Sequence, residues 1–389
     1  MKTIVLMVPS LEHGGSKRSV SNIASLLSDS YNVIVVTFDN SNGVYSCNCP
    51  VIDMGSKAKK GNINKIIPIF KRVGCLKKII KKHNVDIVIS FISSANIVNY
   101  CLSSKVKQII SIRGYGDFLK YEKFIIKSFK KFDAMLVNSK ELKMQCIKRH
   151  SGIEDKVHVL NNYYNKENFD AFMNEECEKN IFDFINGNDI IVILGRIALG
   201  KGHSHLLKSF VKIKEKNSNV RLLIIGDGPE TDHLKDMVNA NKYSDDILMT
   251  GFINNPYKYL KLCKVLVLAS DYEGFPNVIV ESLGCGVPVI SVNCMTGPNE
   301  ILNDNFNPDI EINDIFLADY GILIPKFDKE ATYDYDDYQK QHDILANAVI
   351  KILNDKELYR LYKENARNRF ECYCSEAIKS EYIKFIESV

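Results

Sequence analysis

The feature that most limits the fold of this 389-residue chain is a regular alternation of short apolar runs with helix-length segments. The apolar runs are unbroken, which is the pattern of strands buried on both faces. Such strands separated by helices predict parallel sheets covered by helices on each side. Six runs lie in the first half, at 3–8, 32–38, 86–91, 108–112, 134–138 and 157–160, and six in the second, at 190–194, 221–225, 247–250, 265–269, 287–292 and 321–324.

The length and the number of strands indicate two α/β domains rather than one. We expect a doubly wound, Rossmann-like domain with a parallel sheet over residues 1–170 and a second over residues 171–374. The polar segment 165–189 stands between apolar strands and is the expected join. Because open α/β sheets bind ligands at the carboxyl ends of their strands, the loops that follow strands are the places to look for a site.

The charge of the chain is distributed unevenly. Residues 1–150 contain 25 Lys and Arg but 9 Asp and Glu, whereas the remainder contains 26 and 38. Two basic segments, 65–83 and 120–132, interleave lysines with apolar residues, as helices on an anionic membrane surface do. An ordinary domain helix with a solvated lysine face is the alternative. The lysines alternate with aliphatic rather than stacking aromatic residues, which argues against nucleic acid as a partner.

Other patterns exclude several classes of protein. The run at 87–104 is rich in Ser and Asn and indicates a strand and a polar helix rather than a membrane span. The eleven cysteines lack the spacing of zinc sites and indicate free thiols in a reducing cytosol. His203 and His205 lie on different faces of a predicted helix, and the acidic stretch 334–343 suits a solvated loop or helix start, so we expect no metal. A cytoplasmic protein without a transmembrane helix is expected.

A glycine loop follows the first predicted strand. Gly14 and Gly15 precede Ser16 and a helix-length segment. Backbone N–H groups at such a turn can approach an anion at the helix N-terminus. A tight turn that needs positive φ explains the glycines equally well.

A second candidate loop follows the strand at 190–194. Gly195 and Arg196 come directly after this strand, and Lys201 stands just before the next helix. Arginine offers a bidentate fork to a diphosphate, and lysine offers a point charge. Two solvated surface cations are the alternative.

The stretch DYEGFPNVIVESLGCGVPVI, 271–290, places Glu273 in a loop after a buried strand and Glu281 in a short helix that ends near Gly284. A carboxylate accepts two hydroxyl donors, which suits the vicinal hydroxyls of a ribose or a hexose. The helix start suits the phosphates between two such sugars, so the pattern predicts a nucleoside diphosphate sugar. Two ordinary solvent-facing glutamates are the alternative. The residues at the helix start are Gly274, Phe275, Pro276, Asn277 and Val278.

Several motifs follow one another from Gly195 to Pro325: GRIALGKG, LLIIGDGPE, MTGFINN, the stretch quoted above, GPNEIL and GILIP. Together with the seven residues between Glu273 and Glu281, they resemble the retaining glycosyltransferases of family four. The resemblance implies the GT-B fold, in which two Rossmann-like domains face each other across a cleft. In the first domain, GGSKRSVSNIASLL, AMLVNSK and VHVLNN match more loosely.

The resemblance also implies roles for individual residues. Arg196 and Lys201 would hold the donor diphosphate, Glu281 the ribose and Glu273 the transferred sugar. Phe252 and Ile253 would lie beside the base. The glycine loop of the first domain would close on the phosphate, and the final helix at 375–389 would return to pack on that domain.

The same resemblance implies a substrate class. The donor would be a UDP-linked hexose or N-acetylhexosamine, and the acceptor would be lipid-linked or an oligosaccharide, as in bacterial surface polysaccharide synthesis. No metal cofactor is expected. One departure concerns SIRGYGDF, where many relatives have a histidine; Arg113 lies there and is a candidate acceptor or phosphate contact.

Three other functions remain open from sequence. They are a nucleotide-sugar epimerase of the same architecture, a basic nucleic-acid or membrane-surface binding protein, and an inactive carbohydrate-binding scaffold. The full set of Arg196, Lys201, Glu273 and Glu281 argues against the scaffold.

Overall fold

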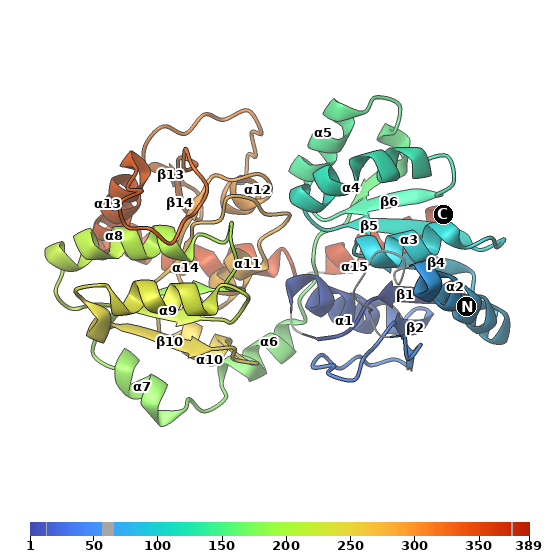
Figure 1. Ribbon diagram of the computed structural model, residues 1–389, viewed down its shortest axis with the longest axis horizontal. Helices are drawn as coiled ribbons and strands as arrows, with labels where there is room; N and C mark the ends of the chain where they lie inside the picture. The colour runs from blue at the N-terminus through green and yellow to red at the C-terminus, as the bar shows by residue number, and fades with distance from the viewer. Residues whose placement is uncertain (13, 57–65, 375) are drawn as a thin grey trace. The chain divides into compact units, whose positions relative to one another are not determined.

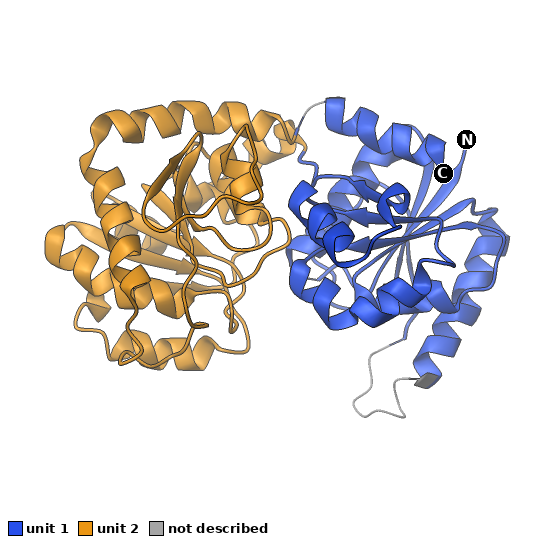
Figure 2. Cartoon of the chain, turned by 90° about the horizontal axis from the view of Figure 1, so that it is seen from above, with its two compact units in different colours: residues 1–164, 374–389 blue, residues 165–373 orange. Residues whose placement is uncertain are grey.

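The computed structural model describes residues 1–12, 14–56, 66–374 and 376–389, which form two compact units (Figures 1 and 2). Unit 1 comprises residues 1–164 and 374–389, and unit 2 comprises residues 165–373. Each unit is an α/β domain built on one seven-stranded, mainly parallel sheet. The expected fold class of two doubly wound domains is confirmed.

The sheet of unit 1 is parallel throughout and has the order β3-β2-β1-β4-β5-β6-β7. Its strands are β1 Thr3–Val8, β2 Asn32–Thr37, β3 Val51–Asp53, β4 Ile87–Phe91, β5 Lys107–Ile112, β6 Ala134–Val137 and β7 Val157–Val159. Its helices are α1 Gly15–Ser28, α2 Ile66–His83, α3 Ser93–Cys101, α4 Tyr115–Ser128, α5 Lys140–Arg149 and α15 Glu376–Ser388.

The sheet of unit 2 has the order β10-β9-β8-β11-β12-β14-β13, and only the β13–β14 pair is antiparallel. Its strands are β8 Asp189–Leu194, β9 Val220–Ile225, β10 Ile247–Gly251, β11 Val265–Leu268, β12 Val289–Val292, β13 Phe316–Ala318 and β14 Gly321–Ile324. Its helices are α6 Lys166–Met173, α7 Lys179–Ile185, α8 His203–Lys216, α9 Thr231–Asn239, α10 Tyr257–Leu260, α11 Asn277–Gly284, α12 Pro298–Leu302, α13 Lys340–Asn354 and α14 Lys356–Glu371.

Every strand predicted from the sequence is present, with ends that differ by at most two residues. The sequence did not reveal β3 and β13, which have three residues each and form the edges of the two sheets. Neither is a long apolar run, because an edge strand is covered on fewer sides than a central one.

The C-terminal helix α15 belongs to the core of unit 1 (Figure 2). Its buried side chains, Tyr382 among them, pack in the same apolar cluster as α1 and β1. Polar contacts add to this packing: Tyr31 Oη donates to Glu387 at 2.7 Å, and Lys379 pairs with Asp29 at 2.9 Å. Residue 375, where the predicted final helix was expected to begin, lies outside the described residues.

The second basic segment differs from the expectation of a helix over 120–132. Helix α4 ends at Ser128, and Phe132 beyond it is buried in the apolar core of unit 1. An aromatic residue that fills the core cannot also belong to an exposed membrane-facing helix. The first segment forms helix α2 from Ile66, and residue 65 lies outside the described residues.

The strand order of unit 2 reverses between β8 and β11, which are neighbours in the sheet. A doubly wound sheet leaves a crevice at the carboxyl ends of the two strands where its order reverses. The loop after β8, 195–202, and the loop after β11, 269–276, therefore meet at the place where this fold binds ligands.

The loops at this edge touch through their backbones. A Cβ atom added to Gly228 would overlap the carbonyl oxygen of Ile197, and one added to Gly202 would overlap that of Ala269. Gly202 also has φ +70°, which favours glycine. The glycines of the motifs GRIALGKG and GDGPE therefore permit a close approach that fixes the loop after β8 between two neighbours.

Candidate functional site

Two of the predicted site residues meet at the switch point of unit 2. Lys201, from the loop after β8, places its Nζ 2.7 Å from Oε1 of Glu273, from the loop after β11. The side chain of Lys201 is 36% exposed and that of Glu273 is 12% exposed. This charge-assisted hydrogen bond joins a cation and a carboxylate at the position where the fold predicts an anionic ligand.

The loop that carries Glu273 is fixed by backbone bonds to the loop that follows β12. The Glu273 N–H donates to the Met295 carbonyl at 2.8 Å, and the Thr296 N–H donates to the Glu273 carbonyl at 3.0 Å. Thr296 Oγ1 also donates to the Gly274 carbonyl at 2.6 Å. The backbone that carries the Glu273 carboxylate is therefore held by hydrogen bonds through both its N–H and its carbonyl group.

A further bond ties the loop after β11 to the loop after β8. The Asp271 N–H donates to the Gly200 carbonyl at 2.9 Å. Asp271 lies two residues before Glu273, and Gly200 lies one residue before Lys201. The two partners of the ion pair are thus held on loops whose backbones are bonded to each other.

Helix α11 begins at Asn277 and ends at Gly284, as the sequence predicted. Glu281 lies within this helix and is buried. Glu281 is buried and Glu273 is partly buried, which argues against the alternative of two solvent-facing glutamates.

The other predicted residues of unit 2 divide into exposed and packed positions. Arg196 is exposed beside Gly195, and no ion pair among the described residues includes it. Phe252 is exposed and Ile253 half-buried where the chain leaves β10. Phe275 is instead buried and packs edge-on against Tyr373, with ring centroids 5.5 Å apart.

The remaining residues at the start of α11 differ in burial. Gly274 and Pro276 are buried, whereas Asn277 and Val278 are half-buried. The structure therefore brings Lys201 and Glu273 into contact, and it exposes the side chains of Arg196 and Phe252.

The predicted residues of unit 1 lie at the carboxyl ends of its strands. Gly14 and Gly15 are exposed at the start of α1, which follows β1, and Ser16 is half-buried. Gly14 is the N-terminal capping residue with φ +132°, so the tight turn expected there is present.

Arg113 follows β5 and is largely enclosed within unit 1. Its guanidinium donates to Asn162 Oδ1, and its centre lies 5.9 Å from the centroid of the Phe91 ring. Burial lowers the pKa of Arg113, while charge interactions with Tyr382 and Tyr164 act in the opposite direction. These contacts give Arg113 a place in the packing of unit 1.

Residues 174–311 match the family model described as glycosyl transferases group 1. The chain is a glycosyltransferase. The matched segment lies within unit 2 and contains Lys201, Glu273 and Glu281.

The glycosyltransferase has relatives over most of its length. It is 29% identical to an uncharacterized glycosyltransferase of Methanocaldococcus jannaschii, over 82% of this chain and 83% of the relative. It is 22% identical to a Campylobacter jejuni N-acetylgalactosamine-N,N'-diacetylbacillosaminyl-diphospho-undecaprenol 4-alpha-N-acetylgalactosaminyltransferase, over 99% of this chain and all of the relative.

A solved structure shares the fold of both units. The Anabaena protein HepE, in complex with UDP and glucose, aligns with a TM-score of 0.76 at 16% identity, over all of both chains. The fold is therefore that of GT-B glycosyltransferases, and these comparisons do not favour the epimerase or the nucleic-acid-binding alternative.

In the ranges that the structure describes, no group of three or more His, Cys, Asp or Glu side chains is arranged to hold a metal ion. Within the same ranges, no helix is long and apolar enough to cross a bilayer.

The sequence pattern did not single out Asp271. It suggested His203 and His205 only as metal ligands, a role that was rejected because they lie on different faces of the helix. Both histidines are buried in the first turn of α8, next to Lys201. Neither ring nitrogen of His203 has a hydrogen-bond partner among the described residues. Burial, with a smaller effect of Lys201, lowers the pKa of His203 to about 4. Their short distance in sequence from Lys201 could have indicated that they lie near the site, because residues in the first turn of a helix lie close to the loop that precedes it.

Because of this low pKa, the free energy of unfolding depends on His203 at acidic pH. The unfolded chain binds a proton at His203 below about pH 6.5 and the folded chain does not, so folding loses free energy as the pH falls toward 4. The expected loss is on the order of 2 kcal/mol by pH 4.5. Urea unfolding of wild type and His203→Leu at pH 7 and pH 4.5 measures it. The variant should lose less stability than wild type between the two pH values; equal losses would contradict the prediction.

Proposed function

We propose that this glycosyltransferase moves a sugar from a nucleoside diphosphate sugar to an acceptor used in surface polysaccharide synthesis, with retention of the anomeric configuration. The observation that carries the proposal is the Lys201–Glu273 pair, at the switch point of unit 2 and inside the matched family domain. A diphosphate needs a cation and a sugar needs a hydrogen-bond acceptor, and the pair offers one of each.

The pair also suggests the first step of donor binding. In the structure Glu273 neutralises the Lys201 ammonium at 2.7 Å. A donor diphosphate competes with Glu273 for this ammonium because it carries more negative charge. The Glu273 carboxylate then accepts hydrogen bonds from hydroxyls of the transferred sugar, while the buried Glu281 receives the ribose hydroxyls.

Stabilisation of the leaving group then accounts for catalysis. Negative charge grows on the diphosphate as the bond to the sugar breaks, and preorganised cations stabilise that charge. Lys201 stands on a fixed loop, and the exposed Arg196 can add a bidentate contact. Because these side chains supply the positive charge, the proposal includes no metal cofactor.

The relatives support the finer choice of substrates. The name of the Campylobacter jejuni relative gives an N-acetylgalactosaminyl group and a diphospho-undecaprenol acceptor, and a Staphylococcus aureus relative, 26% identical over 71% of this chain, is named for capsular polysaccharide biosynthesis. The solved Anabaena protein was crystallised with UDP and glucose. We therefore propose a UDP-linked hexose or N-acetylhexosamine donor and a lipid-linked or oligosaccharide acceptor.

Helix α2 offers a surface suited to a membrane that bears such an acceptor. Ile67 and Phe70, near its start, are each 69% exposed. The lysines on the exposed positions of the same helix are Lys71, Lys77, Lys78, Lys81 and Lys82. The helix contains no acidic residue, so its outer face combines apolar side chains with uncompensated positive charge. Such a face binds anionic lipid by apolar insertion and electrostatic attraction, and the proposal places the enzyme on the cytoplasmic face of the membrane.

Removal of either cation should slow transfer. Arg196→Ala and Lys201→Ala should each lose about 2–4 kcal/mol of transition-state stabilisation, which is about a 30- to 1000-fold fall in kcat/KM. The assay measures sugar transfer with UDP-sugars in the presence and absence of EDTA. Lys212→Ala is the matched control, because Lys212 lies on α8 and pairs with Asp343 on the surface. Unchanged rates in Lys201→Ala, or loss of wild-type activity with EDTA, would contradict the mechanism.

Removal of the basic and apolar face of α2 should weaken membrane binding. The variant Ile67→Ser, Phe70→Ser, Lys77→Gln, Lys81→Gln should bind vesicles of phosphatidylglycerol and phosphatidylcholine at least tenfold more weakly than wild type, since about 1 kcal/mol is expected per lysine near an anionic surface. Vesicle sedimentation at low and physiological salt measures the effect. Lys212→Ala, Lys242→Ala again provides a control with lysines of unit 2. Equal binding of both variants would contradict this surface.

A further inference from the structure

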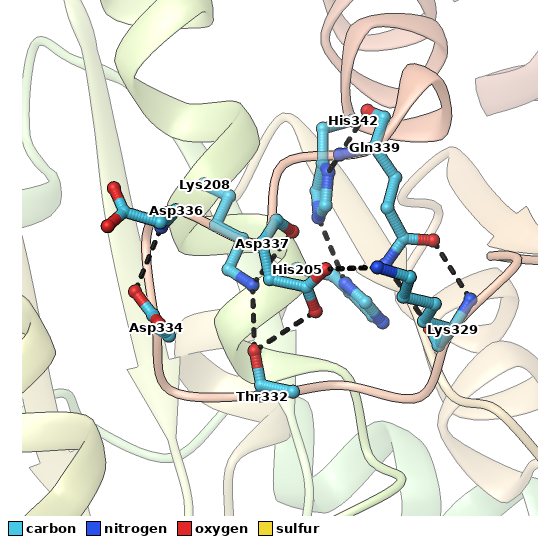
Figure 3. A network of polar contacts seen from close by, with 9 residues as sticks. All are labelled: His205, Lys208, Lys329, Thr332, Asp334, Asp336, Asp337, Gln339 and His342. Carbon is cyan, nitrogen blue, oxygen red and sulfur yellow. Dashed lines mark hydrogen bonds and ion pairs between the residues drawn. The ribbon is translucent and has the colours of Figure 1, made fainter.

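A chain of buried polar groups connects helix α13 to the loop that carries Glu273. His342, in the first turn of α13, places its Nε2 3.0 Å from Nδ1 of His205 on α8 (Figure 3). Both histidines are fully buried. The other nitrogen of His205, Nε2, lies 3.9 Å from Oδ1 of Asp271. The proposed transfer mechanism above does not use either histidine.

The position of each proton in this series of polar groups follows from one backbone group, the N–H of Gln339. The Gln339 N–H donates to Nδ1 of His342 at 2.8 Å, so this nitrogen must be an acceptor (Figure 3). Nδ1 of His342 also lies 3.1 Å from the Gln339 carbonyl, but a proton on Nδ1 would face the proton of the Gln339 N–H. The proton of His342 therefore stands on Nε2 and is donated to Nδ1 of His205. The proton of His205 must then stand on Nε2, which faces Asp271.

Both rings remain uncharged in this arrangement. Burial and repulsion from the nearby Lys208 lower the pKa of His342 to about 3, although the Gln339 backbone and Asp337 oppose this effect. The ring of His205 stacks on Phe327 with centroids 3.7 Å apart and planes within 2°. The stacked ring cannot rotate without losing this contact, so its Nε2–H keeps a fixed direction.

Oδ1 of Asp271 is the acceptor atom that this N–H faces, at 3.9 Å and without a hydrogen bond, and Asp271 is itself bonded to two other loops. Its carboxylate is buried and accepts the Ala331 N–H at 3.4 Å. Its own N–H donates to the carbonyl of Gly200, the residue before Lys201. Two residues after Asp271 comes Glu273, whose carboxylate pairs with Lys201. Asp271 thus links the loops that carry both partners of the ion pair.

We propose that His205, with its tautomer set by His342, is a positioning residue that directs Asp271 and thereby holds Lys201 and Glu273 in register for the donor diphosphate. This inference rests on the proposed function. His205 touches neither the ion pair nor the donor in this account, and its effect passes through Asp271 alone.

The variants His205→Gln and His205→Phe separate positioning from packing. Glutamine keeps an amide N–H near the position of Nε2, where it still faces the Asp271 carboxylate. Phenylalanine keeps a flat ring against Phe327 and removes the donor. His205→Phe should lower kcat with the donor at saturation by about tenfold or more, because small displacements of catalytic groups are costly, and His205→Gln should stay within about threefold of wild type.

The control for these variants is His233→Phe, which makes the same change at an exposed position of α9. Melting temperatures identify any general loss of folding. Wild-type kinetics in His205→Phe would overturn the proposal. An equal fall of kcat in His205→Gln and His205→Phe, at matched melting temperatures, would also overturn it.

A second measurement uses the unaltered protein and does not depend on activity. In ¹⁵N spectra of histidine-labelled wild type at pH 7, His205 and His342 should both be neutral with the proton on Nε2. A proton on Nδ1 of either ring, or a charged ring, would overturn the proposal. If wild type binds and transfers no nucleotide sugar, the proposed function fails and the spectra still decide the tautomers; if wild type transfers sugar and His205→Phe does so equally well, the inference alone fails.

Discussion

The contact between Lys201 and Glu273 joins the two loops that follow β8 and β11, and the proposed function depends on it. Parallel strands deliver their loops to one edge of the sheet, and the reversal of strand order opens a crevice between the two loops. Glycines with no Cβ allow the loop backbones to touch, and the bond from Asp271 to the Gly200 carbonyl holds them. The charges therefore meet on a rigid frame, which is what stabilisation of a leaving diphosphate requires.

The two units carry different parts of the proposed task. Unit 2 contains the family domain, the ion pair and the buried Glu281. Unit 1 contains the basic helix α2, whose apolar start and lysine face suit an anionic surface. The uneven charge along the sequence reflects this division, since the excess of Lys and Arg lies in residues 1–150. The proposal therefore assigns donor chemistry to unit 2 and acceptor delivery to unit 1.

The sequence predicted the central strands well because strands buried on both faces need unbroken apolar runs. It did not reveal β3 and β13, since short edge strands leave no such pattern. The positions of the predicted strands in the sequence placed Lys201 and Glu273 in loops that follow strands. They did not predict the direct contact between the two side chains, which depends on the order of strands in the sheet. The sequence allowed His205 to be considered only as a metal ligand, because its neighbours His342 and Asp271 are distant in sequence. The packing of α8 against α13 brings His342 to it, and the loop after β11 brings Asp271.

The central claim is that Lys201 binds the donor diphosphate and that Glu273 holds the ammonium until the donor arrives. Calorimetric titration with UDP, GDP, ADP and dTDP of wild type, Lys201→Met and Glu273→Gln tests it most directly. The account predicts that wild type binds at least one of them, that Lys201→Met weakens the best of them by on the order of tenfold, about 1.4 kcal/mol, and that Glu273→Gln tightens it because the competing carboxylate is gone. Binding of equal strength to wild type and Lys201→Met, or no binding of any of the four, would contradict the account.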